Sequence, residues 1–280
     1  MKYKVGKWLE QDSIGSVKNT DSKRLRVWLV VVIALAGIAT FLSLPPMSQP
    51  QSYHHFADDR RMLGIPNFLN VASNAPFAVV GAMGLRFVCR RRAANAGHSF
   101  IEGGERAPFA VFFAGAFLTC FGSGYYHWAP DDATLAWDRL PMTLAFMGLL
   151  AAVVAERIDT RAGLRLLGPL VIAGVASVWW WRRSGNLWPY SCAQYFSIVL
   201  IALLLVLFPP RYNRVADLLW VTGFYLLAKA LEALDWQIYR LTKQFVSGHT
   251  LKHLVAAVAV FWVLRMLQRR SPLIRSAQGT

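Results

Sequence analysis

Charged residues are scarce in this 280-residue chain. They make up 16% of it, whereas 55% of the residues are hydrophobic. A soluble domain is typically about one quarter charged, so this shortage excludes an ordinary soluble fold. Cysteine is scarce as well. Cys89, Cys120 and Cys192 show no metal-like spacing, and an odd number cannot pair completely, which argues against a disulfide framework.

Long apolar blocks are what the chain has instead. Each is close to the roughly 20 residues that a helix needs to cross about 30 Å of hydrocarbon. Backbone polar groups in lipid must pair within their own segment, so such blocks are expected to be helices. The sequence therefore predicts eight membrane-spanning helices, over residues 27–44, 68–88, 108–128, 140–155, 166–181, 192–208, 216–236 and 249–267.

The basic residues lie in the gaps between these blocks. With a cytoplasmic N-terminus, 21 of the 30 Lys and Arg fall on the inner side, 8 fall on the outer side, and Lys229 lies within a predicted helix. This bias follows the positive-inside rule and predicts that both ends of the chain are cytoplasmic. The net charge of +15 is thereby explained without nucleic-acid binding.

The predicted organisation is one membrane domain with flanking segments. We expect the first helix to be retained as a signal anchor, because Leu44-Pro45-Pro46 is a poor cleavage site. Tryptophans at the predicted outer helix ends match an interfacial belt, and they are Trp128, Trp137, Trp179, Trp180, Trp181, Trp188 and Trp236. The predicted segments are a disordered basic cytoplasmic tail (1–26), an anchor helix (27–44), an outer polar loop (45–66), a seven-helix domain (67–268) and a cytoplasmic tail (269–280).

Polar side chains gather at the outer ends of three predicted helices. One helix ends with Ser123 and His127, a second begins near Asp138, and the last begins with His249 and His253. The last two histidines are four residues apart, so both imidazoles project from one helical face. Together with His127 they make the three-nitrogen set of a catalytic zinc site, which leaves a fourth position to water. Asp138 could orient or deprotonate that water.

Each of these motifs has a simpler interpretation when taken alone. Histidines spaced four apart can hydrogen-bond across a bundle, serines in membrane helices often bond their own i−4 carbonyl, and Asp138 could cap its helix. However, the chain has only six histidines, and three of them lie at outer ends of apolar blocks. We therefore favour metal binding.

The order Ser123-x-x-x-His127, Asp138, His249-x-x-x-His253 resembles the signature of the CREST superfamily. That group includes alkaline ceramidases, progestin/adiponectin-receptor-like proteins and GPI-remodelling proteins. Two further stretches resemble the alkaline ceramidase branch, especially its bacterial members. They are IPNFLNVASN over residues 65–74 and AKALEALD over 228–235, the latter followed by SGHTLKH over 247–253. The resemblance covers about residues 50–268.

This resemblance implies an all-α integral membrane fold, a seven-transmembrane-helix CREST-type bundle preceded by one extra N-terminal transmembrane helix. It implies zinc binding by His127, His249 and His253, and hydrolysis of the amide bond of ceramide or a related lipid amide. Asp138 would serve as general base and then as proton donor, and Ser123 would donate to the oxyanion. The lipid would come from the bilayer, with the site on the periplasmic face of a bacterial inner membrane.

Calcium is a further cofactor that the resemblance raises. Eukaryotic members bind it through an acidic cluster before the first core helix. Here Asp58 and Asp59 stand in that stretch, and Asn67 replaces a glutamate. Calcium needs six to eight oxygen ligands, so the support for it is weak. The simpler interpretation is that residues 54–61 form a polar lid.

Three rival functions stay open at this point. The chain could be a receptor-like member that binds lipid around a structural zinc, or a hydrolase of another lipid amide or ester. A transporter is disfavoured, because paired Gly/Pro-interrupted helices are not evident. The sequence specifies neither the exact lipid nor an oligomeric state.

Overall fold

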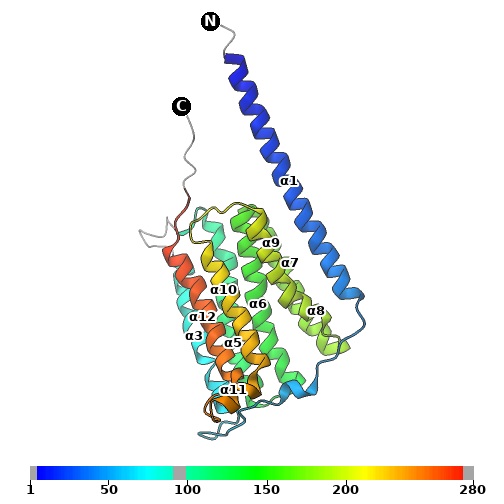
Figure 1. Ribbon diagram of the computed structural model, residues 1–280, viewed down its shortest axis with the longest axis vertical. Helices are drawn as coiled ribbons and strands as arrows, with labels where there is room; N and C mark the ends of the chain where they lie inside the picture. Colours follow the sequence, from blue (N-terminus) through cyan, green and yellow to red (C-terminus); the bar gives the residue numbers. More distant parts are fainter. Residues whose placement is uncertain (1–4, 91–98, 274–280) are drawn as a thin grey trace.

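The computed structural model describes residues 5–90 and 99–273, with side chains from residue 21 onward. Within these residues every regular element is helical, and seven helices are long and apolar enough to cross a membrane (Figure 1). The chain is a multi-pass membrane protein, as its apolar blocks predicted. Residues 1–4 and 274–280 of the two predicted tails, and 91–98 of the first inner loop, lie outside the described residues.

The helices follow the predicted blocks closely. Two of the blocks are interrupted, because α2 and α3 are separated at Ser73-Asn74 and α10 and α11 at Leu234. The elements are α1 (Val5–Ser43), η1 (Gln51–His54), α2 (Phe68–Ala72), α3 (Ala75–Cys89), η2 (Gly103–Glu105), α5 (Arg106–Trp128), α6 (Asp132–Arg157), α7 (Thr160–Ser184), α8 (Trp188–Ser191), a π-helical turn η3 (Cys192–Phe196), α9 (Ser197–Leu207), α10 (Ala216–Ala233), α11 (Asp235–Leu241) and α12 (Gly248–Arg269).

The block over 216–236 differs from the other seven. It forms α10, but the 18 residues of this helix include Asp217, Lys229 and Glu232. Composition alone therefore does not mark α10 as a membrane span. The helix nevertheless packs along α12 within the bundle, so its charged side chains lie against protein.

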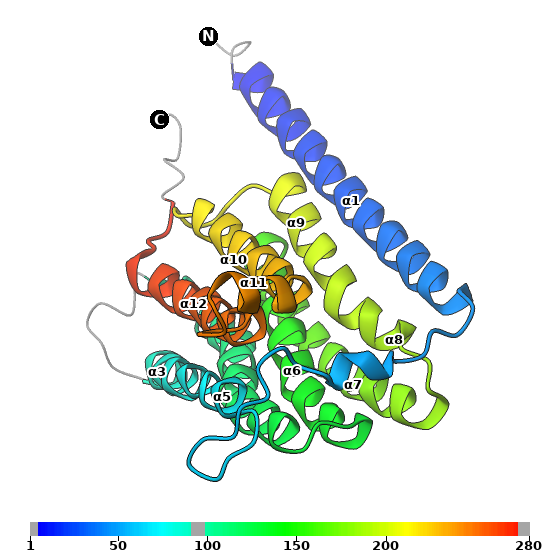
Figure 2. The same ribbon diagram turned by 60° about the horizontal axis from the view of Figure 1, so that its bottom comes forward.

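Helix α1 is longer than the predicted anchor. The expected disordered tail over 1–26 is wrong from Val5 onward, because α1 begins there. No proline interrupts residues 5–43, and extending a helix that has already formed adds one hydrogen bond for each residue ordered. The span lies beside α8 and α9, where Phe41 packs against Trp188 and Phe196 (Figures 1 and 2).

The remaining helices form one bundle. Neighbours in sequence pack together from α3 through α5 and α6 to α7, α9 packs on α6, and α12 joins α10 to α3. Helix α1 begins and α12 ends toward the same end of the molecule, at the top of Figure 1. The loop over 45–66, the α5–α6 connection and α11 lie at the opposite end, which comes forward in Figure 2. We call this opposite end the α11 end.

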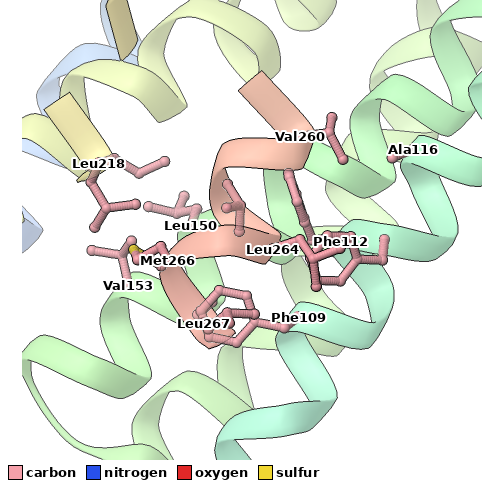
Figure 3. Close-up of a cluster of buried hydrophobic side chains, with 14 of the residues drawn as sticks. Phe109, Phe112, Ala116, Leu150, Val153, Leu218, Val260, Leu264, Met266 and Leu267 are labelled. Atoms are coloured by element: carbon pink, nitrogen blue, oxygen red, sulfur yellow. The ribbon is translucent and has the colours of Figure 1, made fainter. Parts of the chain in front are cut away.

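A hydrophobic cluster holds the helices in register. Phe112 of α5 lies beside Leu264 of α12, and Phe109 beside Leu267, in the half of the bundle away from α11 (Figure 3). Helices α5 and α6 approach closely at Gly115, where an added Cβ would lie 2.5 Å from the backbone nitrogen of Ala145. Small residues permit such contacts between membrane helices. This packing fixes the ends of α5, α6 and α12 relative to one another.

Most tryptophans at the α11 end fit the predicted belt. Trp128, Trp137, Trp179, Trp180 and Trp236 are each at least 50% exposed. Trp188 is half-buried and packs against Phe41. Trp181 does not fit the belt, because it is buried and lies under the guanidinium of Arg139. The belt assignment is therefore wrong for Trp181. Consecutive helical residues point about 100° apart, so a run of three tryptophans cannot face lipid throughout.

Candidate metal site

Three imidazoles meet at the α11 end of the bundle. His127 lies in the last turn of α5, and His249 and His253 lie in the first two turns of α12. All three are at least 95% buried. The Nε2 atom of His127 is 3.3 Å from the Nε2 atom of each of the other two. The convergence predicted from depth and spacing is confirmed, and the group could hold a metal ion.

The geometry of these nitrogens fits a small cation. Zn–N bonds of about 2.0–2.1 Å in a tetrahedral arrangement would separate two ligand nitrogens by about 3.3–3.4 Å. Without a cation, the close contacts of the His127 Nε2 atom with His249 and with His253 would both have to be hydrogen bonds. A ring nitrogen is either a donor of one hydrogen or an acceptor through one in-plane lone pair, so the Nε2 of His127 cannot satisfy both neighbours well. A shared cation satisfies all three nitrogens at once.

Contacts at the start of α12 orient His249 toward the other two imidazoles. Ser247 caps the helix by accepting from the backbone nitrogen of Thr250 at 3.1 Å. Asp235, the first residue of α11, accepts from the backbone nitrogen of His249 at 2.7 Å. Gly248 lets α12 touch α10, because an added Cβ would lie 2.2 Å from the carbonyl oxygen of Leu231 in α10.

The loop over 45–66 covers the imidazoles. The second carboxylate oxygen of Asp235 accepts from the backbone nitrogen of Ala57 at 2.9 Å, which ties the loop to α11. The neighbouring Phe56 ring lies 4.7 Å from the ring of His127 and 4.6 Å from that of His249, between centroids. The predicted polar lid therefore covers the site through an apolar residue. Nothing in the local sequence singles out Phe56.

Ser73 supports the ring of His253 from behind. Its Oγ lies 2.8 Å from the Nδ1 of His253, on the side away from the other imidazoles. Metal-binding histidines commonly use their second nitrogen in this way, which fixes the tautomer and the ring orientation. Ser73 lies at the break between α2 and α3, where its hydroxyl also reaches the carbonyl of Asn70. The quoted motif contains this serine, but its contact with His253 was not predicted.

We expect Ser73→Ala to weaken metal binding about 10–100-fold, the range typical when an outer partner of a ligating histidine is lost. The dissociation constant can be measured by competition with a chelator of known affinity. Ser177→Ala is the matched control, because this buried serine bonds only its own helix, at the carbonyl of Gly174. Equal affinities of the two variants would contradict the support assigned to Ser73.

A cavity of about 420 Å³ extends from His253 into the bundle. His253 lines it, and so do Ser123 and Asp138, with the serine beside the carboxylate. The structure therefore brings both predicted catalytic residues to the cavity that reaches the metal site. The deeper lining is apolar and includes Phe77, Phe112, Leu149, Ile201, Leu218 and Val260, three of which are labelled in Figure 3.

Asp58 and Asp59 do not form an acidic cluster in the described part of the chain. Arg60 holds both carboxylate oxygens of Asp58 through its Nε and Nη2 atoms, at 2.8 and 2.7 Å. Asp59 is exposed, and neither residue belongs to the ligand group that could hold a metal. Because the Asp58 carboxylate is already neutralised by an arginine, these residues give calcium no support.

A second charged group lines the same cavity. Glu232 accepts from Lys252 at 2.5 Å, from the Tyr53 hydroxyl at 3.0 Å, and also from Lys229. Burial raises the pKa of Tyr53 well above its ordinary value, and the Glu232 carboxylate raises it further. Tyr53 therefore stays protonated and donates to Glu232. The pairing also explains how Lys229 is accommodated within an apolar helix.

Neither comparison with known proteins found a match, since no protein-family model fits this sequence and no curated protein resembles it closely enough to be matched. The resemblance described above therefore rests on the quoted motifs. The function of the site has to follow from its geometry and chemistry.

Proposed function

We propose that the chain is a zinc-dependent membrane hydrolase of the alkaline ceramidase branch of the CREST superfamily. It would cleave the amide bond of ceramide or of a related lipid amide. One observation carries this proposal: three buried imidazoles meet, and one of them, His253, lines the polar end of a largely apolar cavity. Metal ligands joined to a space suited to an acyl chain support lipid hydrolysis. In this proposal residues 67–268 are the seven-helix core, and α1 is the extra helix.

The chain's own residues supply the proton transfers. Bound zinc would provide Lewis acidity toward the amide carbonyl and toward water. Asp138 accepts a proton from the attacking water and delivers it to the amine nitrogen as the C–N bond breaks. Ser123 donates a hydrogen bond to the carbonyl oxygen as negative charge develops there. One water is consumed, and the products are a fatty acid and a sphingoid base or another amine.

The cavity suits a lipid that arrives from the bilayer. Residues of α9 and α10, such as Ile198 and Val221, line it together with residues of α5 and α6. Apolar walls exclude water from the acyl chain, and the polar groups remain at the α11 end. In this proposal the scissile amide lies beside Asp138 and the hydrocarbon lies away from it.

Product analysis by mass spectrometry tests the proposal. Purified, zinc-loaded protein is incubated with ceramides, N-acyl amines and phospholipids, and His253→Ala protein serves as the negative control. We expect a fatty acid and a free amine from at least one amide, and no turnover by the variant. Cleavage of phospholipids alone would identify an ester hydrolase. Tight lipid binding without any product, in protein that retains zinc, would favour the receptor-like alternative.

The proposal includes an orientation in a bacterial inner membrane, with cytoplasmic termini and a periplasmic α11 end. It follows from the excess of basic residues predicted on the inner side. In protein with Cys89, Cys120 and Cys192 replaced, Ser52→Cys should react with an impermeant maleimide added from outside. Ser52 is exposed in the loop over 45–66, and exposed Arg161 at the opposite end provides the control. Arg161→Cys should react from the cytoplasmic side. The reverse pattern would overturn the orientation.

A further inference from the structure

Arg139 is a buried cation in the wall of the cavity, next in sequence to Asp138. It is 5% exposed, and its guanidinium carbon lies 4.1 Å from the ring centroid of Trp181 and 4.5 Å from that of Tyr190. Arginine stacks well on aromatic faces because its charge is delocalised over a plane. Contacts with two rings restrict the orientation of that plane, and Arg139 lines the cavity.

The hydrogen bonds of Arg139 are incomplete. Its Nη2 atom donates to the Oε1 of Gln49 at 2.5 Å, whereas Nη1 is buried without a partner in the described part of the chain. No carboxylate of the described residues lies within ion-pair distance of this guanidinium, although the equally buried Arg270 pairs with Glu156 at 2.7 Å. Burying a charge is costly unless it is paired. The missing anion is therefore expected from a ligand.

Neither carboxylate of the cavity lining forms an ion pair with Arg139. The lining contains the basic residues Arg139, Lys229 and Lys252 and the acidic residues Asp138 and Glu232. Glu232 is taken by both lysines. Asp138 lies beside Ser123 and attracts the Arg139 guanidinium electrostatically, but it forms no ion pair with it. The lining thus carries one positive charge in excess, and Arg139 is its one basic residue without an ion pair among the described residues.

We infer that Arg139 binds an oxyanion on the headgroup of the lipid, so that the preferred substrate is an acidic lipid amide. The oxyanion is a carboxylate, phosphate or sulfonate, since a guanidinium edge matches the paired oxygens of these groups. The inference rests on the proposed hydrolase function and specifies its substrate class. Arg139 acts here as a specificity-determining residue, while Asp138 and Ser123 carry the chemistry.

Matched lipid amides test this inference. N-palmitoylglycine and N-palmitoylethanolamine share the acyl chain and the amide. The first ends in a carboxylate and the second in a hydroxyl. Ceramide 1-phosphate against ceramide gives the same comparison for a phosphate. We expect the wild-type protein to favour the acidic member of at least one pair in kcat/KM. Arg139→Met should reduce that acidic-to-neutral ratio about 10–100-fold, as expected for a lost hydrogen bond to a charged group.

Two further variants test whether the change in the acidic-to-neutral ratio is specific to the guanidinium of Arg139. Arg139→Lys keeps the charge without the planar edge and should retain part of the preference, which also covers the case that Arg139→Met folds poorly. Arg183→Met is the matched control, because Arg183 also stacks on a tryptophan, Trp179, at 5.2 Å, but does not line the cavity. It should leave the ratio unchanged. A wild-type protein with no acidic preference, and an unaltered ratio in both Arg139 variants, would overturn the inference.

A binding measurement separates this inference from the hydrolase proposal. N-palmitoylglycine should raise the Tm of the wild-type protein more than N-palmitoylethanolamine does, and Arg139→Met should abolish the difference. If this holds but no amide is cleaved, the hydrolase proposal fails and the anion site stands. If neutral and acidic amides are cleaved alike, the anion site fails and the hydrolase stands. If Arg139→Met relieves only inhibition by palmitate, the residue binds the product carboxylate and the inference is overturned.

Discussion

Replacing His127, His249 or His253 by alanine is expected to remove about one equivalent of zinc per chain and to abolish amide hydrolysis. Zinc at a catalytic site is held by three protein ligands, and the Nε2 atom of His127 lies 3.3 Å from that of His249 and from that of His253, as such a site requires. Removing one imidazole leaves two ligands, which are too few to hold the ion. Elemental analysis of folded, purified variants measures the metal, and product analysis measures the activity.

The control for this series is His55→Ala. His55 is exposed in the loop over 45–66, so its loss should leave both zinc content and activity unchanged. Circular dichroism and elution as a single species show that each variant is folded before metal is measured. Stoichiometric zinc in all three single variants would refute the metal site. Loss of zinc with retained turnover would show that the ion is structural.

Asp138→Asn should lower kcat by about 10²–10⁴-fold, the range typical of general acid–base catalysis. An amide has nearly the size and hydrogen-bonding reach of the carboxylate, but it cannot take up and deliver a proton. The variant should keep close to one equivalent of zinc, because Asp138 does not belong to the ligand group. Steady-state kinetics on the substrate found by product analysis, with zinc measured in the same preparation, checks both parts.

Ser123→Ala should have a smaller effect than Asp138→Asn. A single oxyanion donor typically contributes about 10²–10³-fold when it acts without a metal, and a bound cation would already stabilise the same charge. Ser123→Thr should restore part of the rate, since it returns the hydroxyl. Loss of metal in Asp138→Asn would make that residue a ligand or its direct support. Complete loss of activity in Ser123→Ala would require reconsidering this serine as a nucleophile. Full activity in both variants would remove the catalytic interpretation.

Depth in the membrane was readable from the sequence. Hydrophobicity is a local property, and a bilayer of fixed thickness converts it into a position along each helix. The end of one block and the start of another therefore placed His127 and His249 at the same level, and the four-residue spacing placed His253 on the same face as His249. The structure confirms this part, because the three imidazoles meet.

Rotation about the helix axes and the path of the loops were decided only by tertiary packing. Phe56 covers the imidazoles because Asp235 ties down the loop, and Trp181 turns inward beneath Arg139 although its two neighbours face outward. Such contacts join residues that are distant in sequence, and each depends on how side chains of several helices fill space together. Composition and residue spacing do not specify that packing. The sequence therefore determined where the site lies along the bundle, whereas only the tertiary structure decided which side chains surround it.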